Sequence, residues 1–255
     1  MRRLEATGVG KAFGGVVALA EVDLAVDAGE VVGLIGPNGA GKTTLFNCLL
    51  GMDRPDRGRI LLDGVDVTRL PVHERARRGM GRTFQRVELF AEFTVRQHLA
   101  VAARARSRRG AMVAGAGGSR RSSAAEAEAV AVLLDRLGLT GDADQPAQTL
   151  SLGRTRLVEL GRALATEPSV VLADEPSSGL DEVERAALAR TLPSVTEQGA
   201  AVVLIEHDLD LIRQVTSRCY VLAAGRLVVS GPTREALDDP RVAAAYGVPG
   251  RGGGG

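Results

Sequence analysis

Short apolar runs, well separated from one another, set the pattern of this chain. Continuous or alternating apolar residues predict strands at residues 22–26, 31–35, 59–62, 170–173, 201–205, 220–223 and 226–229. Several of these runs are apolar throughout, which is typical of strands buried on both faces of a parallel sheet. Apolar residues recur with helical spacing at 130–137 and 157–164. The strands bracket a helix-rich middle, roughly residues 87–166, and predict an α/β fold with an inserted helical subdomain.

The composition narrows the class of protein. Of the 255 residues, 45% are apolar and 25% charged, as in soluble globular proteins. The 32 basic and 31 acidic residues leave a formal net charge of +1, so no global positive field favours a nucleic-acid partner. No apolar run approaches the ~20 residues that a membrane span requires. Cys48 and Cys219 lack metal-site spacing, and we expect a reduced, cytosolic chain that reaches a membrane only through a partner.

Two segments have compositions typical of weak order. Residues 104–123 are rich in Arg, Gly, Ala and Ser and poor in large apolar side chains. We expect a solvated loop between two helices there, and not a nucleic-acid contact, because aromatic stacking partners are missing. Residues 249–255 end in four consecutive glycines and predict a flexible tail.

A glycine-rich loop follows the predicted strand at 31–35. It reads Gly36, Pro37, Asn38, Gly39, Ala40, Gly41, Lys42, Thr43 and Thr44. The G-x-x-x-x-G-K-[ST] spacing between a strand and a helix predicts a phosphate-binding loop, in which backbone N–H groups surround the anion. Lys42 is one of only two lysines in an arginine-rich chain, and its compact ammonium suits the β- and γ-phosphates. Thr43 offers a hydroxyl to Mg²⁺; the alternative is a chance glycine-rich turn.

Polar side chains follow two further apolar strands. Asp174 and Glu175 end one strand, and His207 comes soon after the next. Because ligands bind at the carboxyl ends of strands in open α/β sheets, we expect Asp174 to hold Mg²⁺ and Glu175 to polarise the water that attacks the γ-phosphate. His207 could hydrogen-bond the γ-phosphate, and Gln85 could reach the metal or the water. Taken singly, these residues also fit a solvated turn and surface side chains.

The order of these motifs resembles the nucleotide-binding subunit of ABC transporters. The matching segments are the phosphate loop, Gln85, Leu150-Ser151-Leu152-Gly153-Arg154, Asp174-Glu175, Ser178-Gly179-Leu180-Asp181 and His207. The resemblance implies a P-loop NTPase (RecA-like) core with an N-terminal antiparallel β subdomain and an inserted α-helical subdomain. The implied boundaries are 1–86 and 167–246 for the ATP-binding core, 87–166 for the helical subdomain and 247–255 for the tail.

The resemblance also implies how ATP and Mg²⁺ are held, between two chains that face each other head to tail. Ser151 and Gly153 of the signature segment would contact the γ-phosphate bound to the other chain, with Asp181 nearby. Phe13 would stack on adenine, or else fill the core. The implied metal ligands are Thr43, Gln85 and Asp174, and the implied catalytic residues are Lys42, Glu175 and His207. The usual signature sequence, LSGGQ, has its first glycine where this chain has Leu152 and its glutamine where this chain has Arg154. A bulky residue at the first-glycine position is familiar in one branch of the family. Arg154 is a less usual replacement, and it puts the efficiency of dimer closure in question.

That branch comprises the importers of branched-chain amino acids. The residues that resemble it are 46–49, 81–85, 89–90, 94–95, 205–208 and 245–246. The resemblance implies an ATPase at the cytoplasmic face of a membrane. Its implied partners are transmembrane permease subunits, a second ATP-binding subunit and, indirectly, a substrate-binding protein, without nucleic acid. Residues 85–98 would transmit closure to the permease. An exporter ATPase, a soluble non-transport ABC protein, a P-loop kinase or GTPase, and a regulatory module that holds ATP without splitting it remain alternatives.

Overall fold

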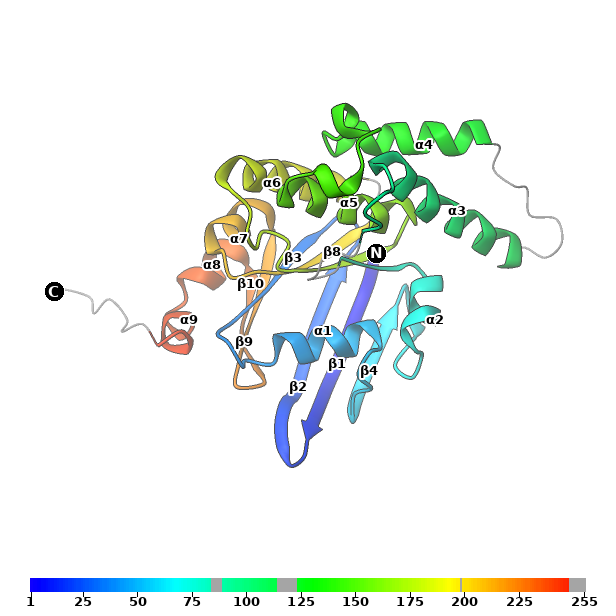
Figure 1. Cartoon of the computed structure of the whole chain (residues 1–255). Helices are drawn as coiled ribbons and strands as arrows, with labels where there is room; N and C mark the ends of the chain where they lie inside the picture. Colours follow the sequence, from blue (N-terminus) through cyan, green and yellow to red (C-terminus); the bar gives the residue numbers. More distant parts are fainter. Residues whose placement is uncertain (84–88, 114–122, 198, 248–255) are drawn as a thin grey trace.

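The chain folds into two β-sheets with helices between and around them (Figure 1). The computed structural model describes residues 1–83, 89–113, 123–197 and 199–247. The antiparallel sheet has the order β2-β1-β4-β5 and comprises β1 (Arg2–Phe13), β2 (Val16–Asp27), β4 (Arg57–Leu62) and β5 (Val65–Asp66). The second sheet has the order β10-β9-β3-β8-β7-β6 and comprises β3 (Val31–Ile35), β6 (Met80–Arg82), β7 (Val170–Asp174), β8 (Ala201–Ile205), β9 (Arg218–Ala223) and β10 (Arg226–Pro232).

The second sheet is parallel except for its edge strand β10, and both of its faces are buried. Side chains alternate along each strand, so neighbouring residues belong to different cores. Val32 and Leu34 of β3 pack with α1 (Lys42–Leu50) and the antiparallel sheet, whereas Val31 and Ile35 pack with the helices of the opposite face. The predicted apolar runs all lie in strands of these two sheets, and the α/β fold with an N-terminal antiparallel part is confirmed.

Most of the helices fall into two groups in Figure 1, and α1 and α2 lie apart from both. Helices α3 to α6 gather at the top of the view, and α7 to α9 lie beside β9 and β10. The helices besides α1 are α2 (Val72–Arg77), α3 (Val95–Val113), α4 (Ser123–Arg136), α5 (Leu152–Ala165), α6 (Glu182–Thr196), α7 (Leu209–Val215), α8 (Thr233–Asp238) and α9 (Pro240–Ala245), with short 3₁₀ turns at Thr140–Asp142 and Ala147–Thr149. Within the described residues, none of the helices is both long and apolar enough to cross a lipid bilayer.

The prediction of a loop from residue 104 onward is wrong for its first half, because α3 continues to Val113. Alanine and arginine, which dominate this stretch, are strong helix formers. Leu99 and Ala103 anchor the earlier part of α3 in the core, and the helix packs on α4 and α5. The remaining loop residues, 114–122, and the predicted tail at 249–255 lie outside the described residues.

Candidate active site

The glycine-rich loop joins β3 to α1 at the carboxyl-terminal edge of the parallel strands. Close packing requires glycine at two of its positions. A Cβ on Gly36, whose φ is 151°, would lie 2.0 Å from the Leu222 carbonyl oxygen, and one on Gly41, whose φ is 102°, would lie 2.6 Å from that of Ala18. Since the N-cap of α1 is Gly41, no side chain caps the first-turn N–H groups, which stay available to an anion.

Backbone carbonyl groups of the loop hold the Lys42 side chain in place. Its Nζ donates hydrogen bonds to the carbonyl oxygens of Gly36 (2.6 Å) and Pro37 (3.0 Å), and the side chain is buried. Burial lowers the pKa of Lys42, while the nearby carboxylates of Glu175 and Asp174 act in the opposite direction. A bound phosphate would further favour the charged ammonium.

Asp174 is the last residue of β7 and lies at the same edge of the sheet. Burial raises the pKa of this carboxyl, and the neighbouring Glu175 raises it further, against the lowering effect of Arg82 and Lys42. A buried carboxylate under these forces gains from a divalent cation. Among the described residues no three His, Cys, Asp or Glu side chains gather as a metal cage. Mg²⁺ commonly takes one or two protein carboxylates together with substrate phosphates, so Asp174 and the exposed Thr43 are suitable donors.

The structure brings Glu175 and His207 together. Strands β7 and β8 run parallel with Asp174 paired to Ile205, so the residues that follow them meet at one edge. Nε2 of His207 lies 2.6 Å from Oε1 of Glu175. Glu175 adopts a φ of 48°, rare for a residue with a side chain, and its N–H donates to the Ile205 carbonyl oxygen at 2.9 Å. This sharp turn directs the Glu175 carboxylate to the imidazole.

Glu206 is a site residue that sequence reasoning missed. Its side chain is only 2% exposed, and Oε1 accepts a hydrogen bond from the N–H of Ser177 at 2.9 Å. Oε2 accepts from the N–H of His207 at 3.2 Å. Glu206 therefore ties the turn after β7 to the turn after β8. Glu206 could have been identified from the sequence as an acidic residue that directly follows an apolar strand, which is the feature that identified Asp174.

The signature segment lies at the start of α5, and its contacts are with α6. Ser151 is the N-cap of α5, and its Oγ donates to Oε1 of Glu184 at 2.5 Å. The Glu184 carboxyl group lies over Gly153, where an added Cβ would come within 2.2 Å of it. Leu152 is exposed, and its Cδ2 lies against Gly179. Among the described residues the structure thus links Ser151 and Gly153 to α6 of the same chain, and not to the phosphate loop.

Arg154 and Asp181 stabilise the ends of the helices that carry this segment. Nη1 of Arg154 donates to the Gly138 carbonyl oxygen at 2.5 Å and lies 3.0 Å from Oδ2 of Asp142. Asp181 is the N-cap of α6 and accepts from the N–H of Glu184 at 2.8 Å in a capping box. Both side chains are therefore engaged within the chain.

Phe13 ends β1 and is 48% exposed, so it is not core filling. Nζ of Lys11 lies 5.2 Å from the centroid of the Phe13 ring, a cation–π arrangement. The same Nζ donates to the Arg54 carbonyl oxygen (2.9 Å) and to Asp56 (3.1 Å). The predicted metal contact Gln85 lies outside the described residues.

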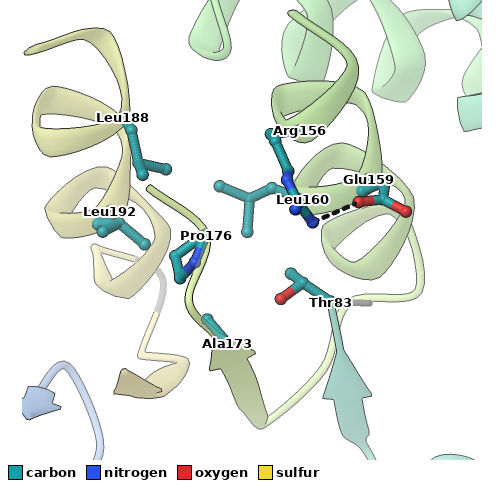
Figure 2. A pocket seen from close by; sticks show the side chains of 8 residues that line it. All are labelled: Thr83, Arg156, Glu159, Leu160, Ala173, Pro176, Leu188 and Leu192. Atoms are coloured by element: carbon teal, nitrogen blue, oxygen red, sulfur yellow. Dashed lines mark ion pairs between the residues drawn. The ribbon is translucent and has the colours of Figure 1, made fainter. Parts of the chain in front are cut away.

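Figure 2 shows how α5 and α6 pack beside the end of β7. The cavity there has a volume of about 10 Å³, roughly that of one water, so it is a packing void and not a nucleotide site. Arg156 and Glu159, both from α5, form an ion pair of 3.5 Å at its rim. The lining residues are Thr83, Arg156, Glu159, Leu160, Ala173, Pro176, Leu188 and Leu192. The signature helix α5 therefore packs against α6, and a residue of β7, Ala173, lines the small void between them.

Comparison with known proteins identifies the family. Residues 19–178 match the ABC transporter family. The high-affinity branched-chain amino acid transport ATP-binding protein BraF of Pseudomonas aeruginosa is 38% identical, over 95% of this chain and 96% of its own. The corresponding protein LivG of Escherichia coli K12 is 36% identical over 95% and 96%. The lipopolysaccharide export system ATP-binding protein LptB of Haemophilus influenzae is 32% identical over 96% and 97%.

Solved structures agree with this family and with the fold. The ADP conformation of MJ1267, an ATP-binding cassette of an ABC transporter, superposes with a TM-score of 0.82 at 30% identity, covering 96% of this chain and 98% of that one. A nucleotide-free ATP-binding cassette from an ABC transporter gives a TM-score of 0.79 at 28% identity, over 96% and 99%. The resemblance in the motifs is thereby confirmed: the chain belongs to the ABC transporter family, as one of its ATP-binding subunits.

Proposed function

We propose that the chain hydrolyses ATP to drive a membrane importer of branched-chain or related amino acids. The observation that carries the enzymatic part is the Glu175–His207 contact of 2.6 Å, at the edge of the sheet that also holds the phosphate loop. The importer part is supported by relatives named as branched-chain amino acid transport proteins, which match the chain over nearly its whole length.

The phosphate loop binds the triphosphate. Backbone N–H groups at the start of α1 donate to phosphate oxygens, and Lys42 places its ammonium on the β- and γ-phosphates. Thr43, Asp174 and Gln85 are the oxygen donors for Mg²⁺, which when bound neutralises phosphate charge. Phe13 offers the ring face opposite Lys11 to adenine.

Glu175 is the general base for the attacking water. As the water oxygen bonds to the γ-phosphorus, its proton passes to the Glu175 carboxylate and the bond to the β–γ bridging oxygen breaks. His207 holds the Glu175 carboxylate in place through Nε2. Glu206 fixes the backbone of both turns and thus the distance between these two side chains.

Two chains complete the site. Ser151 and Gly153 of one chain donate to the γ-phosphate bound to the other, so ATP joins the two chains and hydrolysis releases them. In this proposal residues 1–86 and 167–246 form the ATP-binding core, residues 87–166 the helical subdomain and residues 247–255 the tail. The second chain is either a copy of this one or a related subunit.

The permease would dock beside the start of α3. Phe90 and Phe93 are both exposed, and both rings contact the buried His98. His98 Nε2 lies 3.1 Å from the Phe90 carbonyl oxygen, so this apolar corner is fixed to α3. Docking there places the chain at the cytoplasmic face of the membrane. An exporter ATPase is the second candidate, because LptB is 32% identical; uptake of labelled amino acid by vesicles holding the full complex separates the two.

Glu175→Gln tests the enzymatic proposal, because the amide retains the shape of the side chain but cannot accept the proton. We expect ATP to bind normally, hydrolysis to fall by roughly 100- to 10,000-fold, and a dimer to accumulate with Mg-ATP on a sizing column. Glu235→Gln, an exposed position on α8, is the control and should behave as wild type. Normal turnover by Glu175→Gln would remove Glu175 from its role.

A further inference from the structure

The signature serine already has an anionic partner within its own chain. Ser151 Oγ donates to Glu184 Oε1 at 2.5 Å, although 33 residues separate the two along the sequence. Ser151 is the N-cap of α5, and Glu184 lies in the first turn of α6. The contact thus joins the two helices at the ends that carry the signature segment and Asp181.

A hydroxyl has only one proton to donate. While Ser151 donates to Glu184, it cannot donate to a phosphate oxygen. The Glu184 carboxylate is therefore the group that occupies the donor of Ser151 before a γ-phosphate does. Both acceptors are anionic oxygens, so one can replace the other without leaving the hydroxyl unpaired.

Glu184 also covers the signature glycine. An added Cβ on Gly153 would lie 2.2 Å from the carboxyl carbon of Glu184 and 2.5 Å from its Oε2. The carboxylate thus lies directly on the segment that has to meet the triphosphate of the other chain. A negative charge there opposes an incoming phosphate through like-charge repulsion.

The backbone around α6 holds Glu184 in this position. Its N–H donates to Asp181 Oδ1 at 2.8 Å, and its Oε2 accepts from the Asp181 N–H at 3.4 Å. Leu152, the residue that replaces the usual signature glycine, packs its Cδ2 on Gly179 of the same turn. These contacts bind the signature segment to residues 179–184 as one unit.

We propose that Glu184 is a positioning residue that holds the place of the γ-phosphate in the single chain. When two chains close, the γ-phosphate displaces the carboxylate from Ser151; when phosphate leaves, Glu184 takes the hydroxyl back and favours opening. Glu184 thereby sets the ATP concentration at which two chains close. This inference rests on the proposed function, in which Ser151 binds the nucleotide of the partner chain.

The test measures the dimer fraction against Mg-ATP concentration in the slow-hydrolysing Glu175→Gln chain, with and without Glu184→Gln. Glutamine retains the capping box, because Gln serves at that position as Glu does. We expect the half-maximal ATP concentration for dimerisation to fall about three- to tenfold, because a charged acceptor is replaced by a neutral one. ATP binding to the monomer, followed with a fluorescent ATP analogue at low protein concentration, should not change.

Two further variants separate this role from general effects. Glu182→Gln removes the same charge from the same helix turn at an exposed side chain, and should leave the midpoint unchanged. Glu184→Ala removes the acceptor altogether and should lower the Tm in any case, because it breaks the capping box. If Glu184 serves only as part of the helix cap, the half-maximal ATP concentration for dimerisation should rise. Our proposal predicts that this concentration falls despite the lower Tm. With Ser151→Ala in place, Glu184→Gln should shift the midpoint less than it does in the presence of Ser151, because only the like-charge repulsion then remains.

The possible failures are distinct. If Glu175→Gln alone forms no dimer at any ATP concentration, the proposed function fails, and this inference fails with it. If it forms the dimer but Glu184→Gln leaves the midpoint unchanged or raises it, only the role of Glu184 is overturned.

Discussion

The two halves of the proposed ATP site are built in opposite ways. The phosphate-loop half lies at the ends of β3, β7 and β8, and Lys42 and Asp174 within it are buried. The signature half begins at Ser151 on the surface, where the side chains are exposed and held by helix caps. One half is fixed by the sheet and the other by contacts between α5 and α6.

This difference explains what one chain can do alone. In the buried half, burial lowers the pKa of Lys42 and raises the pKa of Asp174, which disfavours the charged form of each group. A triphosphate with Mg²⁺ therefore supplies charge interactions that the protein alone lacks. In the exposed half, the Ser151 hydroxyl already donates to Glu184 of the same chain. This half therefore gains less from binding a ligand. We therefore expect a single chain to bind ATP and a pair of chains to hydrolyse it.

Lys42→Ala should have the largest effect, because it removes the buried cation of the phosphate loop. At 100 times its Kd, ATP stabilises a folded protein by about 2.7 kcal/mol, and the variant should lose this stabilisation entirely. The measurement is the rise in Tm on adding Mg-ATP. Lys42→Arg retains the charge but not the compact ammonium, and should recover only part of the rise. An unchanged rise in Lys42→Ala would contradict the phosphate-loop assignment.

His207→Ala tests the chemical step within the same half. Loss of the partner 2.6 Å from Glu175 should lower kcat about 100- to 1,000-fold, since a preorganised polar contact to the reacting groups contributes that much. ATP binding to the single chain should be retained. His73 is exposed on α2, so His73→Ala serves as the control in the same phosphate-release assay. Comparable activity of the two variants would show that the Glu175–His207 contact has no catalytic role.

The buried half was also the part that the sequence predicted better. Strands apolar on both faces leave continuous runs in the sequence, and the residues at their carboxyl ends, such as Asp174 and His207, must then share one edge. The short edge strand β6 (Met80–Arg82) carries no such run and was not predicted. Glu206 was passed over because its role depends on accepting backbone N–H groups from a neighbouring turn.

The contacts of the exposed half could not be predicted from spacing. Ser151 and Glu184 meet only because α5 and α6 pack together, and no periodicity within either helix indicates their partner. The contacts of Lys11 with Arg54 and Asp56 depend likewise on the fold, because 43 and 45 residues, respectively, separate Lys11 from them along the sequence. In α3, the composition suggested a loop, but the helix propensity of Ala and Arg and the packing of the first turns prevailed.

Phe13→Ala should have an intermediate effect, on binding alone. Loss of the stacking ring should weaken ATP binding by about 1–3 kcal/mol, which is roughly 5- to 150-fold in Kd. The rate at saturating ATP should not change, because adenine lies away from the γ-phosphate. Isothermal titration with the slow-hydrolysing Glu175→Gln chain gives the Kd, and Phe13→Tyr should retain most of the affinity. An equal loss in Phe13→Tyr, or none in Phe13→Ala, would show that the ring is not the adenine platform.

Arg154→Ala should have the smallest effect, and it tests whether the exposed half depends on the residue that departs from the usual glutamine. The guanidinium is engaged with Gly138 and Asp142, and an exposed ion pair of this kind contributes about 0.2–1 kcal/mol to the free energy of unfolding. Arg96→Ala breaks a comparable exposed pair, 2.9 Å from Asp144, and should cost a similar amount in urea unfolding. ATP-dependent dimerisation should be nearly unchanged in both. A large loss of dimerisation in Arg154→Ala alone, at similar stability, would mean that Arg154 leaves Asp142 on closure and contacts the nucleotide or the partner chain.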